Sequence, residues 1–202
     1  MPTLLVFLKY PTPGRVKTRL AAHAGDQRAA DLYREWIGLV LAQVQPLRTS
    51  VRVVGFFDGG TQKDFAAWDS LVDQWLQQPD GDLGNRLRAG FEFAHGDGGS
   101  VAAIGTDCLE VEAALLQSAF DMLKDKDAVF GPAQDGGYYL VGTARPLIGF
   151  FDGIPWSSHT TLEAHLSLCR KHNWSVDLLP ARRDIDTWED WLAYRDGKEH
   201  RP

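Results

Sequence analysis

The sequence has little cysteine, no long apolar run and fewer basic than acidic residues. Its two cysteines, Cys108 and Cys169, form no CxxC pair, which excludes a disulfide framework and fits a reducing compartment. The apolar stretch at the N-terminus meets a charge at Lys9, too early for a secretory or spanning segment. No later run reaches the roughly 18 apolar residues that a membrane span needs. We therefore expect a cytoplasmic protein with no membrane span.

The charge balance also argues against one class of partner. Lys and Arg total 21 and Asp and Glu total 27, which gives a formal net charge of −6 among 202 residues. General nucleic-acid binders usually carry a basic face, so nucleic acid is not an expected partner. Any site for an anion must then be local.

Several catalytic motifs are absent from the sequence. It holds no GxxxxGK[ST] loop, no GxGxxG at a helix start, no HExxH pair and no GxSxG elbow. These absences argue against the P-loop nucleoside triphosphatases, the dinucleotide-binding fold, the common zinc peptidases and the serine hydrolases of the α/β class.

Hydrophobic periodicity predicts alternating strands and helices along one domain, residues 1–202. Short apolar runs predict strands, and apolar positions at helical spacing predict helices. The expected strands are 4–8, 51–57, 101–104, 128–130, 138–141 and 176–179; the expected helices are 29–44, 64–75, 85–95, 112–124, 162–172 and 187–194. This alternation predicts an α/β fold, a three-layer α/β/α sandwich with a mostly parallel sheet.

A basic segment follows the first expected strand. Residues 9–20 carry Lys9, Arg15, Lys17 and Arg19 without any acid, and Gly14 could shape the loop. Clustered ammonium and guanidinium groups suit a polyphosphate. The alternative is a solvated basic loop that forms surface ion pairs.

Two aspartates are candidate ligands for a divalent cation. Asp107 follows the expected strand 101–104, and Asp186 precedes the last expected helix. Mg²⁺ binds one or two carboxylates at about 2.1 Å, so the two carboxylates should lie roughly 4–6 Å apart. Without the ion they would repel, and one could pair with a Lys or Arg instead. The alternative is that each aspartate only caps a helix.

Glycine-rich loops supply further candidates for substrate binding. Paired glycines allow a backbone to approach a ligand closely, and an aspartate can accept hydrogen bonds from hydroxyl groups. The alternatives are an Asp-Gly hairpin turn and a tryptophan that belongs to the core. We expect Gly14, Gly105 and Asp135 to open onto one cleft at the carboxyl ends of the strands. The candidates are Asp82, Gly84, Arg86, Asp135, Gly136, Gly137, Tyr138 and Trp156.

Five segments carry a resemblance to a known family, in order along nearly the whole chain. They are 7–20 (FLKYPTPGRVKTRL), 81–86 (GDLGNR), 105–107 (GTD), 131–138 (GPAQDGGY) and 184–187 (DIDT). This combination resembles a family of small GT-A-like transferases, described as glycosyltransferases of uncharacterised activity. Their superfamily, the nucleotide-diphospho-sugar transferases, includes 2-phospho-lactate guanylyltransferase and the CMP-sugar synthetases.

The resemblance implies roles for particular residues. Segment 9–19 would contact nucleotide phosphates, with Lys17 and Arg19 as catalytic cations. Asp107 would be a catalytic aspartate and a ligand of Mg²⁺ or Mn²⁺, and Asp186 would be the second carboxylate. The chain has Thr106-Asp107 where many glycosyltransferases have Asp-x-Asp, which favours nucleotidyl transfer.

The expected function is metal-dependent transfer of a nucleotidyl group from a nucleoside triphosphate to a phosphorylated small molecule. One alternative is a glycosyltransferase that uses a nucleotide-sugar. A second alternative is a nucleotide-binding protein without catalysis. A nucleotide and a small-molecule acceptor are the expected partners.

Overall fold

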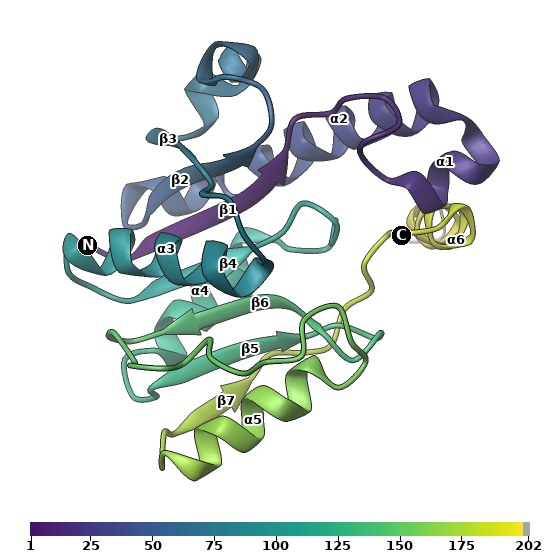
Figure 1. Ribbon diagram of the computed structural model, residues 1–202. Coiled ribbons are helices and arrows are strands. Elements are labelled where there is room, and N and C mark those ends of the chain that lie inside the picture. The colour runs from purple at the N-terminus through teal and green to yellow at the C-terminus, as the bar shows by residue number, and fades with distance from the viewer. Residues whose placement is uncertain (200–202) are drawn as a thin grey trace.

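The computed structural model describes residues 1–199, which form a seven-stranded sheet in the order β3-β2-β1-β4-β6-β5-β7 (Figure 1). All neighbouring strands are parallel except that β6 runs antiparallel to both β4 and β5. The predicted mostly parallel sheet is therefore confirmed. The strands are β1 (Thr3–Lys9), β2 (Arg52–Asp58), β3 (Gln74–Gln77), β4 (Val101–Ile104), β5 (Ala128–Pro132), β6 (Tyr138–Thr143) and β7 (Val176–Leu178).

Helices cover both faces of this sheet, which confirms the three-layer sandwich (Figure 1). Apolar residues of α1, α2 and α4 pack with one face, and those of α3 and α5 pack with the other. The α-helices are α1 (Thr18–Ala24), α2 (Asp26–Gln43), α3 (Leu83–Gly96), α4 (Ala113–Met122), α5 (Thr161–Lys171) and α6 (Trp188–Glu199); the 3₁₀ helices are η1 (Gln45–Thr49) and η2 (Gln62–Leu71).

Strand β1 shows why its apolar run is continuous. Leu4, Val6 and Leu8 belong to the hydrophobic core on one face, and Leu5 belongs to the core on the other. Successive side chains of a strand point to opposite faces, so a strand covered on both sides must be apolar throughout.

The sheet divides at its carboxyl end between β1 and β4. Strand β1 pairs with β2 as far as Lys9 and Asp58, but with β4 only as far as Val6 and Ile104. The chain leaves β1 toward β2 on one side and reaches β4 on the other. In such sheets this change of direction forms a crevice beyond the strand ends, where ligands bind.

One predicted helix is wrong. Residues 64–75 do not form an α-helix but the 3₁₀ helix η2 followed by the edge strand β3. A capping box between Thr61 and Asp64 starts η2. The Trp75 ring packs over the backbone of Gly55 in β2, where a Cβ would come within 2.2 Å of it. Aromatic packing on the neighbouring strand thus fixes an extended conformation that local periodicity did not indicate. Helix α1 was also not predicted.

Residues 131–138 confirm the hairpin alternative. Strands β5 and β6 are antiparallel, and the Asp-Gly turn lies between them.

No helix within residues 1–199 is both long and apolar enough to cross a membrane. The predicted single domain, residues 1–202, includes residues 200–202, which lie outside the described part of the chain.

Candidate active site

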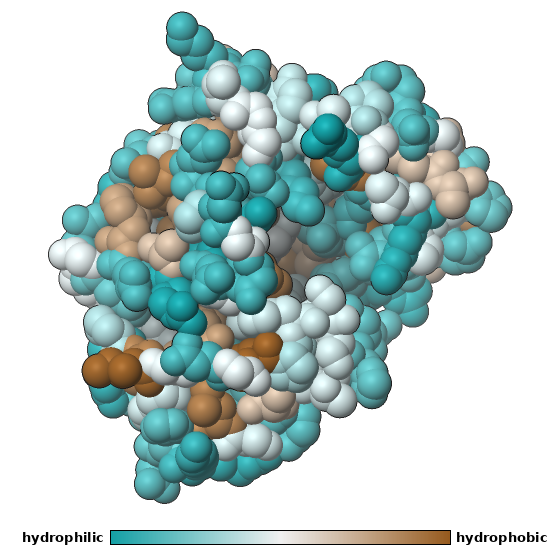
Figure 2. Space-filling view, in the orientation of Figure 1, coloured by the Kyte–Doolittle hydropathy of each residue, from teal (hydrophilic) through white to brown (hydrophobic). Residues whose placement is uncertain are grey.

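A cleft of about 710 Å³ lies beyond the carboxyl ends of β1 and β4. The molecule is hollowed near the middle of the face in Figure 2, between the β1–β3 part and the β5–β7 part. Eight predicted site residues line this cleft: Lys9, Arg15, Lys17, Arg19, Arg86, Asp107, Tyr138 and Asp186.

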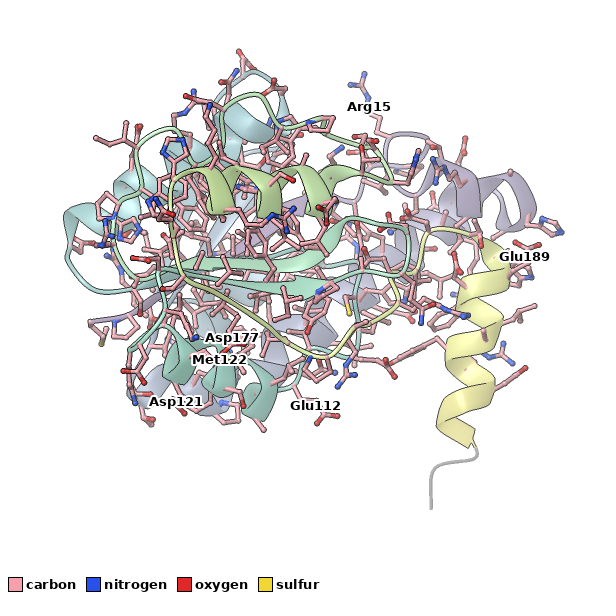
Figure 3. The ribbon with its side chains drawn as sticks, turned by 90° about the horizontal axis from the view of Figure 1, so that it is seen from below. Arg15, Glu112, Asp121, Met122, Asp177 and Glu189 are labelled. Atoms are coloured by element: carbon pink, nitrogen blue, oxygen red, sulfur yellow. The ribbon has the colours of Figure 1, made fainter. Side chains whose placement is uncertain are left out.

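The basic segment supplies most of the positive charge at the cleft. Lys9 ends β1, and Arg15, Lys17 and Arg19 lie in or just after the loop that leads into α1. Arg15 extends away from the body of the protein, and the Arg19 side chain is 77% exposed (Figure 3). Both side chains are open to solvent, although Arg19 Nη1 also lies 3.9 Å from Asp186 Oδ2. The Lys17 side chain, in contrast, is only 6% exposed.

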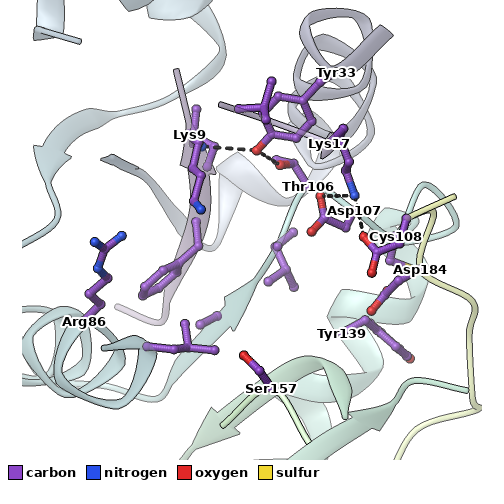
Figure 4. A pocket seen from close by; sticks show the side chains of 18 of the residues that line it. Lys9, Lys17, Tyr33, Arg86, Thr106, Asp107, Cys108, Tyr139, Ser157 and Asp184 are labelled. Atoms are coloured by element: carbon purple, nitrogen blue, oxygen red, sulfur yellow. Dashed lines mark hydrogen bonds and ion pairs between the residues drawn. The ribbon is translucent and has the colours of Figure 1, made fainter. Parts of the chain in front are cut away.

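Lys17 brings the two predicted metal ligands together. Its ammonium nitrogen Nζ lies 2.9 Å from Asp107 Oδ1 and 2.9 Å from Asp186 Oδ1 (Figure 4 shows Asp107). The carboxylates are half-exposed, at 47% and 43%. Both carboxylates therefore face one point, which is the arrangement that a shared divalent cation requires. The sequence allows for pairing of one of these acids with a Lys or Arg; here one lysine contacts both.

Neither aspartate caps a helix. Helix α4 follows Glu112, and the side chain of Glu112 makes no capping hydrogen bond. Before α6, Thr187 and Asp190 form the reciprocal bonds instead: the Thr187 amide donates to Asp190 Oδ2, and the Asp190 amide donates to Thr187 Oγ1. The capping alternative therefore does not account for Asp107 or Asp186.

The surroundings set the charge of Lys17. Burial by itself would lower the pKa of Lys17, but the ion pairs with Asp107 and Asp186 outweigh it, and the pKa is raised. Lys17 is therefore cationic at neutral pH and offsets the repulsion between the two carboxylates.

Asp184 is a third carboxyl group at the cleft, and the sequence reasoning did not single it out. Burial, together with the charges of Asp107, Asp135 and Asp186, raises the pKa of Asp184 to about 7. Its Oδ1 is buried without a hydrogen-bond partner, and its side chain lies near Asp107 and Tyr139 in the cleft (Figure 4). The sequence signal that could have identified Asp184 as a site residue was its position in the segment 184–187 (DIDT).

Tyr33 of α2 joins the two strand ends that flank the crevice. The Lys9 amide donates to the Tyr33 hydroxyl at 3.1 Å, and that hydroxyl is 2.8 Å from Thr106 Oγ1 (Figure 4). Burial raises the pKa of Tyr33 to about 12, so the phenol stays protonated. Nothing in the local sequence signals this role, because Tyr33 occupies an apolar position of an ordinary amphipathic helix.

Arg86 lines the opposite wall, held by a polar network. Its guanidinium donates to Asp58 Oδ2 at 2.7 Å and to Gln78 Oε1 at 3.2 Å. Gln78 in turn donates to the Phe56 carbonyl at 2.6 Å. This network connects Arg86 of α3 to the end of β2 and holds its positively charged guanidinium in the cleft.

Other predicted site residues lie outside the lining of this cleft. Asp82 caps α3 by accepting from the Asn85 amide at 2.8 Å. Asp135 accepts from the Gly137 amide at 2.8 Å within its own turn. Of the three positions expected to open onto one cleft, Gly105 lines it, whereas Gly14 and Asp135 do not.

Steric packing explains the glycines at positions 84 and 136. A Cβ on Gly84 would lie 2.5 Å from Trp156 Nε1, and one on Gly136 would lie 2.0 Å from the His159 carbonyl oxygen. Gly84, Asp82 and Trp156 line a second, smaller cavity of about 260 Å³.

Cys108 is not a plausible nucleophile. It is 2% exposed, and burial raises its pKa to about 12. A buried thiol of this kind is inert.

The comparisons with known proteins identify the family. Residues 40–158 match the family "Uncharacterized protein conserved in bacteria (DUF2064)", and the chain belongs to it. No curated protein sequence matches the chain.

Solved structures share the fold over nearly the whole chain. A protein from Desulfovibrio desulfuricans G20, provisionally named a nucleotide-diphospho-sugar transferase, is 33% identical with a TM-score of 0.89, covering 98% of this chain and 88% of its own. A nucleotidyl transferase from Methanothermobacter is 18% identical with a TM-score of 0.69, covering 98% and 97%. Rv0371c from Mycobacterium tuberculosis H37Rv, in complex with manganese, is 15% identical with a TM-score of 0.55, covering 95% and 96%.

Proposed function

We propose that the chain is a divalent-metal-dependent nucleotidyltransferase that moves a nucleotidyl group from a nucleoside triphosphate to a phosphorylated small molecule. One observation carries this proposal. Asp107 and Asp186, from distant parts of the chain, converge at the wall of a cleft whose lining also carries Lys9, Arg15, Lys17, Arg19 and Arg86. Carboxylates that face one point beside a basic loop suit a cation shared with a polyphosphate.

The donor set fits Mg²⁺ or Mn²⁺. Asp107 and Asp186 offer hard carboxylate oxygens that are half-exposed to the cleft. No group of three or more His, Cys, Asp and Glu side chains suited to a metal occurs within residues 1–199. Two protein carboxylates, with substrate phosphates and water as the other ligands, match the way in which Mg²⁺ is usually held. The manganese complex of Rv0371c, a protein of similar fold, supports the same ion class. When bound, the cation would neutralise charge on the α-phosphate and the leaving pyrophosphate.

The chain's own cations would position the nucleotide. Lys9, Arg15 and Arg19 reach the cleft from one wall, and Arg86 reaches it from the other. Guanidinium and ammonium groups bind phosphate oxygens, and a triphosphate held at several points presents its α-phosphate to the acceptor in a fixed orientation. The acceptor phosphate attacks in line, its oxygen bonds to the α-phosphorus, and pyrophosphate leaves. Fixed charges around the α-phosphate stabilise that transition state.

Two observations favour nucleotidyl transfer. The segment before the first metal ligand reads Thr106-Asp107 and lacks the Asp-x-Asp of many glycosyltransferases. The related fold from Methanothermobacter is named a nucleotidyl transferase.

A second candidate is glycosyl transfer from a nucleotide-sugar. It is compatible with the 33% identical protein that is provisionally named a nucleotide-diphospho-sugar transferase, a name that covers both kinds of transfer. The same cations would then hold the diphosphate of the donor, and a nucleoside diphosphate would leave.

The products distinguish these reactions. The protein is incubated with each nucleoside triphosphate or common nucleotide-sugar, Mg²⁺ or Mn²⁺, and a pool of phosphorylated and hydroxylated acceptors. Release of pyrophosphate supports nucleotidyl transfer, and release of a nucleoside diphosphate from a nucleotide-sugar supports the second candidate. Nucleotide-induced thermal stabilisation without either product would contradict both and indicate a binding protein without catalysis.

A further inference from the structure

The ammonium of Lys17 occupies the point on which the two carboxylates converge. It contacts Asp107 Oδ1 and Asp186 Oδ1, each at 2.9 Å, and it also donates to the Ile185 carbonyl. An ammonium group has three hydrogens. The three acceptors therefore use all three hydrogens, and the ammonium has no hydrogen left to donate to a phosphate while these contacts last.

The surroundings of Lys17 show that this arrangement is built into the fold. Its side chain is 6% exposed, and its Nζ lies 5.4 Å from the centre of the Trp36 ring. Trp36 is itself fully buried in α2. Lys17 is thus an internal counter-ion that contacts both carboxylates, whereas the exposed Arg19 lies 3.9 Å from Asp186 alone.

We propose that Lys17 competes with the divalent cation for Asp107 and Asp186, so that the metal binds tightly only when Lys17 is drawn onto another anion. This inference rests on the proposed function, because it takes the two aspartates as the metal ligands. A cation about 2.1 Å from both carboxylates would overlap the position of the ammonium. Two positive charges at that separation also repel strongly.

The nucleotide supplies the other anion. Lys17 lines the same cleft as Lys9, Arg15 and Arg19, so a polyphosphate held by these side chains offers new acceptors to its ammonium. Lysine carries its charge on a flexible four-carbon stem and can change partners by rotation of that stem. The structure therefore links metal and nucleotide binding. By thermodynamic reciprocity, each ligand raises the affinity of the protein for the other.

The test measures binding of Mn²⁺ alone, by calorimetry, with no nucleotide present. Lys17→Met keeps the length of the stem and removes the competing charge. We expect Lys17→Met to bind Mn²⁺ at least tenfold more tightly than the wild type. The matched control is Lys9→Met, which removes a cleft cation whose side chain makes no described contact with either carboxylate. Its Mn²⁺ affinity should stay within threefold of the wild type.

Two results would overturn the inference. One is a Lys17→Met protein that binds Mn²⁺ no more tightly than the wild type. The other is an equal gain in Lys9→Met, which would show a general effect of charge on the cleft.

The wild-type protein provides a second measurement if Lys17→Met does not fold. The ¹⁵N NMR signal of the Lys17 ammonium reports its partners directly. We expect that signal to change when Mg²⁺ and a non-hydrolysable triphosphate analogue are added together, and to change far less with millimolar Mg²⁺ alone. An unchanged signal with both ligands bound would show that Lys17 keeps its carboxylate partners.

Failure of this inference is distinguishable from failure of the proposed function. Metal-dependent pyrophosphate release by the wild type, with no gain of Mn²⁺ affinity in Lys17→Met, would overturn the competition alone. A tenfold gain of affinity without turnover of any nucleotide would support the competition and overturn the reaction.

Discussion

Aspartates in two regions of the molecule look alike in sequence but behave differently in the structure. Asp107 and Asp186 follow extended segments and direct their carboxylates to a lysine from a third segment. Asp82 and Asp135 also lie in polar loops at the ends of elements, yet each accepts a hydrogen bond from a backbone amide two or three residues away. Asp82 and Asp135 are thus satisfied within their own loops, whereas Asp107 and Asp186 converge from distant segments on the Lys17 ammonium.

The largest expected effect separates these two regions directly. Asp107→Asn and Asp186→Asn should each lower metal-dependent turnover by at least about 100-fold, because neutralisation of the metal-bound phosphates is worth several kcal/mol. Asp82→Asn should stay close to the wild type, since Asn caps helices about as well as Asp. Steady-state kinetics over a Mg²⁺ titration provide the measurement, with circular dichroism to verify folding. Equal losses of turnover in all three variants would show that Asp107 and Asp186 do not differ in role from Asp82.

The next largest effect is on the free energy of unfolding, and it arises at His165 of α5, on the β5–β7 side of the molecule. His165 is fully buried among aromatic rings, and its Nε2 lies 2.6 Å from the Phe150 carbonyl oxygen. Burial lowers the pKa of His165 to about 4, although that carbonyl contact opposes the shift. The unfolded chain, with a pKa near 6.5, binds a proton that the folded protein does not. The free energy of unfolding should therefore fall by up to about 3 kcal/mol as the pH decreases from 6.5 to 4.

Urea denaturation at several pH values tests this expectation. His165→Gln removes the titrating group and should flatten the decline between pH 6.5 and 4. His159→Gln, at an exposed position, should retain it. A decline that is as steep in His165→Gln as in the wild type would assign the pH dependence to other groups.

A smaller effect is expected at the basic loop. Arg19→Ala should weaken nucleotide binding by about 1.5–3 kcal/mol, the contribution of a hydrogen bond to a charged group. The free energy of unfolding should change little, because exposed ion pairs contribute little to stability. The control is Arg28→Ala on the surface of α2, where Arg28 pairs with Glu35. Nucleotide titrations that cannot distinguish Arg19→Ala from Arg28→Ala would show that the loop is only surface.

The smallest effect concerns the hydroxyl that joins the two walls of the crevice. Tyr33→Phe leaves the Lys9 amide and the Thr106 hydroxyl without their shared partner, and it should lower the free energy of unfolding by about 1 kcal/mol. Tyr10→Phe is the control, because its ring packs against Phe65 in both forms. Chemical denaturation of the two variants provides the comparison, and equal stabilities would contradict the bridging role.

The fold was predictable from local patterns because its central strands are buried on both faces. Continuous apolar runs such as residues 4–8 signal such strands. The edge strand Gln74–Gln77 gave no such signal, since its pairing with β2 and the packing of Trp75 on Gly55 are contacts between distant segments. The same limit applies to the site. The charged motifs predicted Asp107, Asp186 and Lys17, whereas the contributions of Tyr33 and Asp184 depend on burial and on contacts between distant segments.

The position of a bound metal tests the central claim most directly. Crystals grown with Mn²⁺ and a non-hydrolysable triphosphate analogue would locate the ion by its anomalous scattering. We expect one Mn²⁺ bound by both Asp107 and Asp186, with a phosphate oxygen among its other ligands and the Lys17 ammonium displaced toward the phosphates. An ion held elsewhere, with Lys17 still between the two aspartates while the nucleotide occupies the cleft, would contradict the central claim.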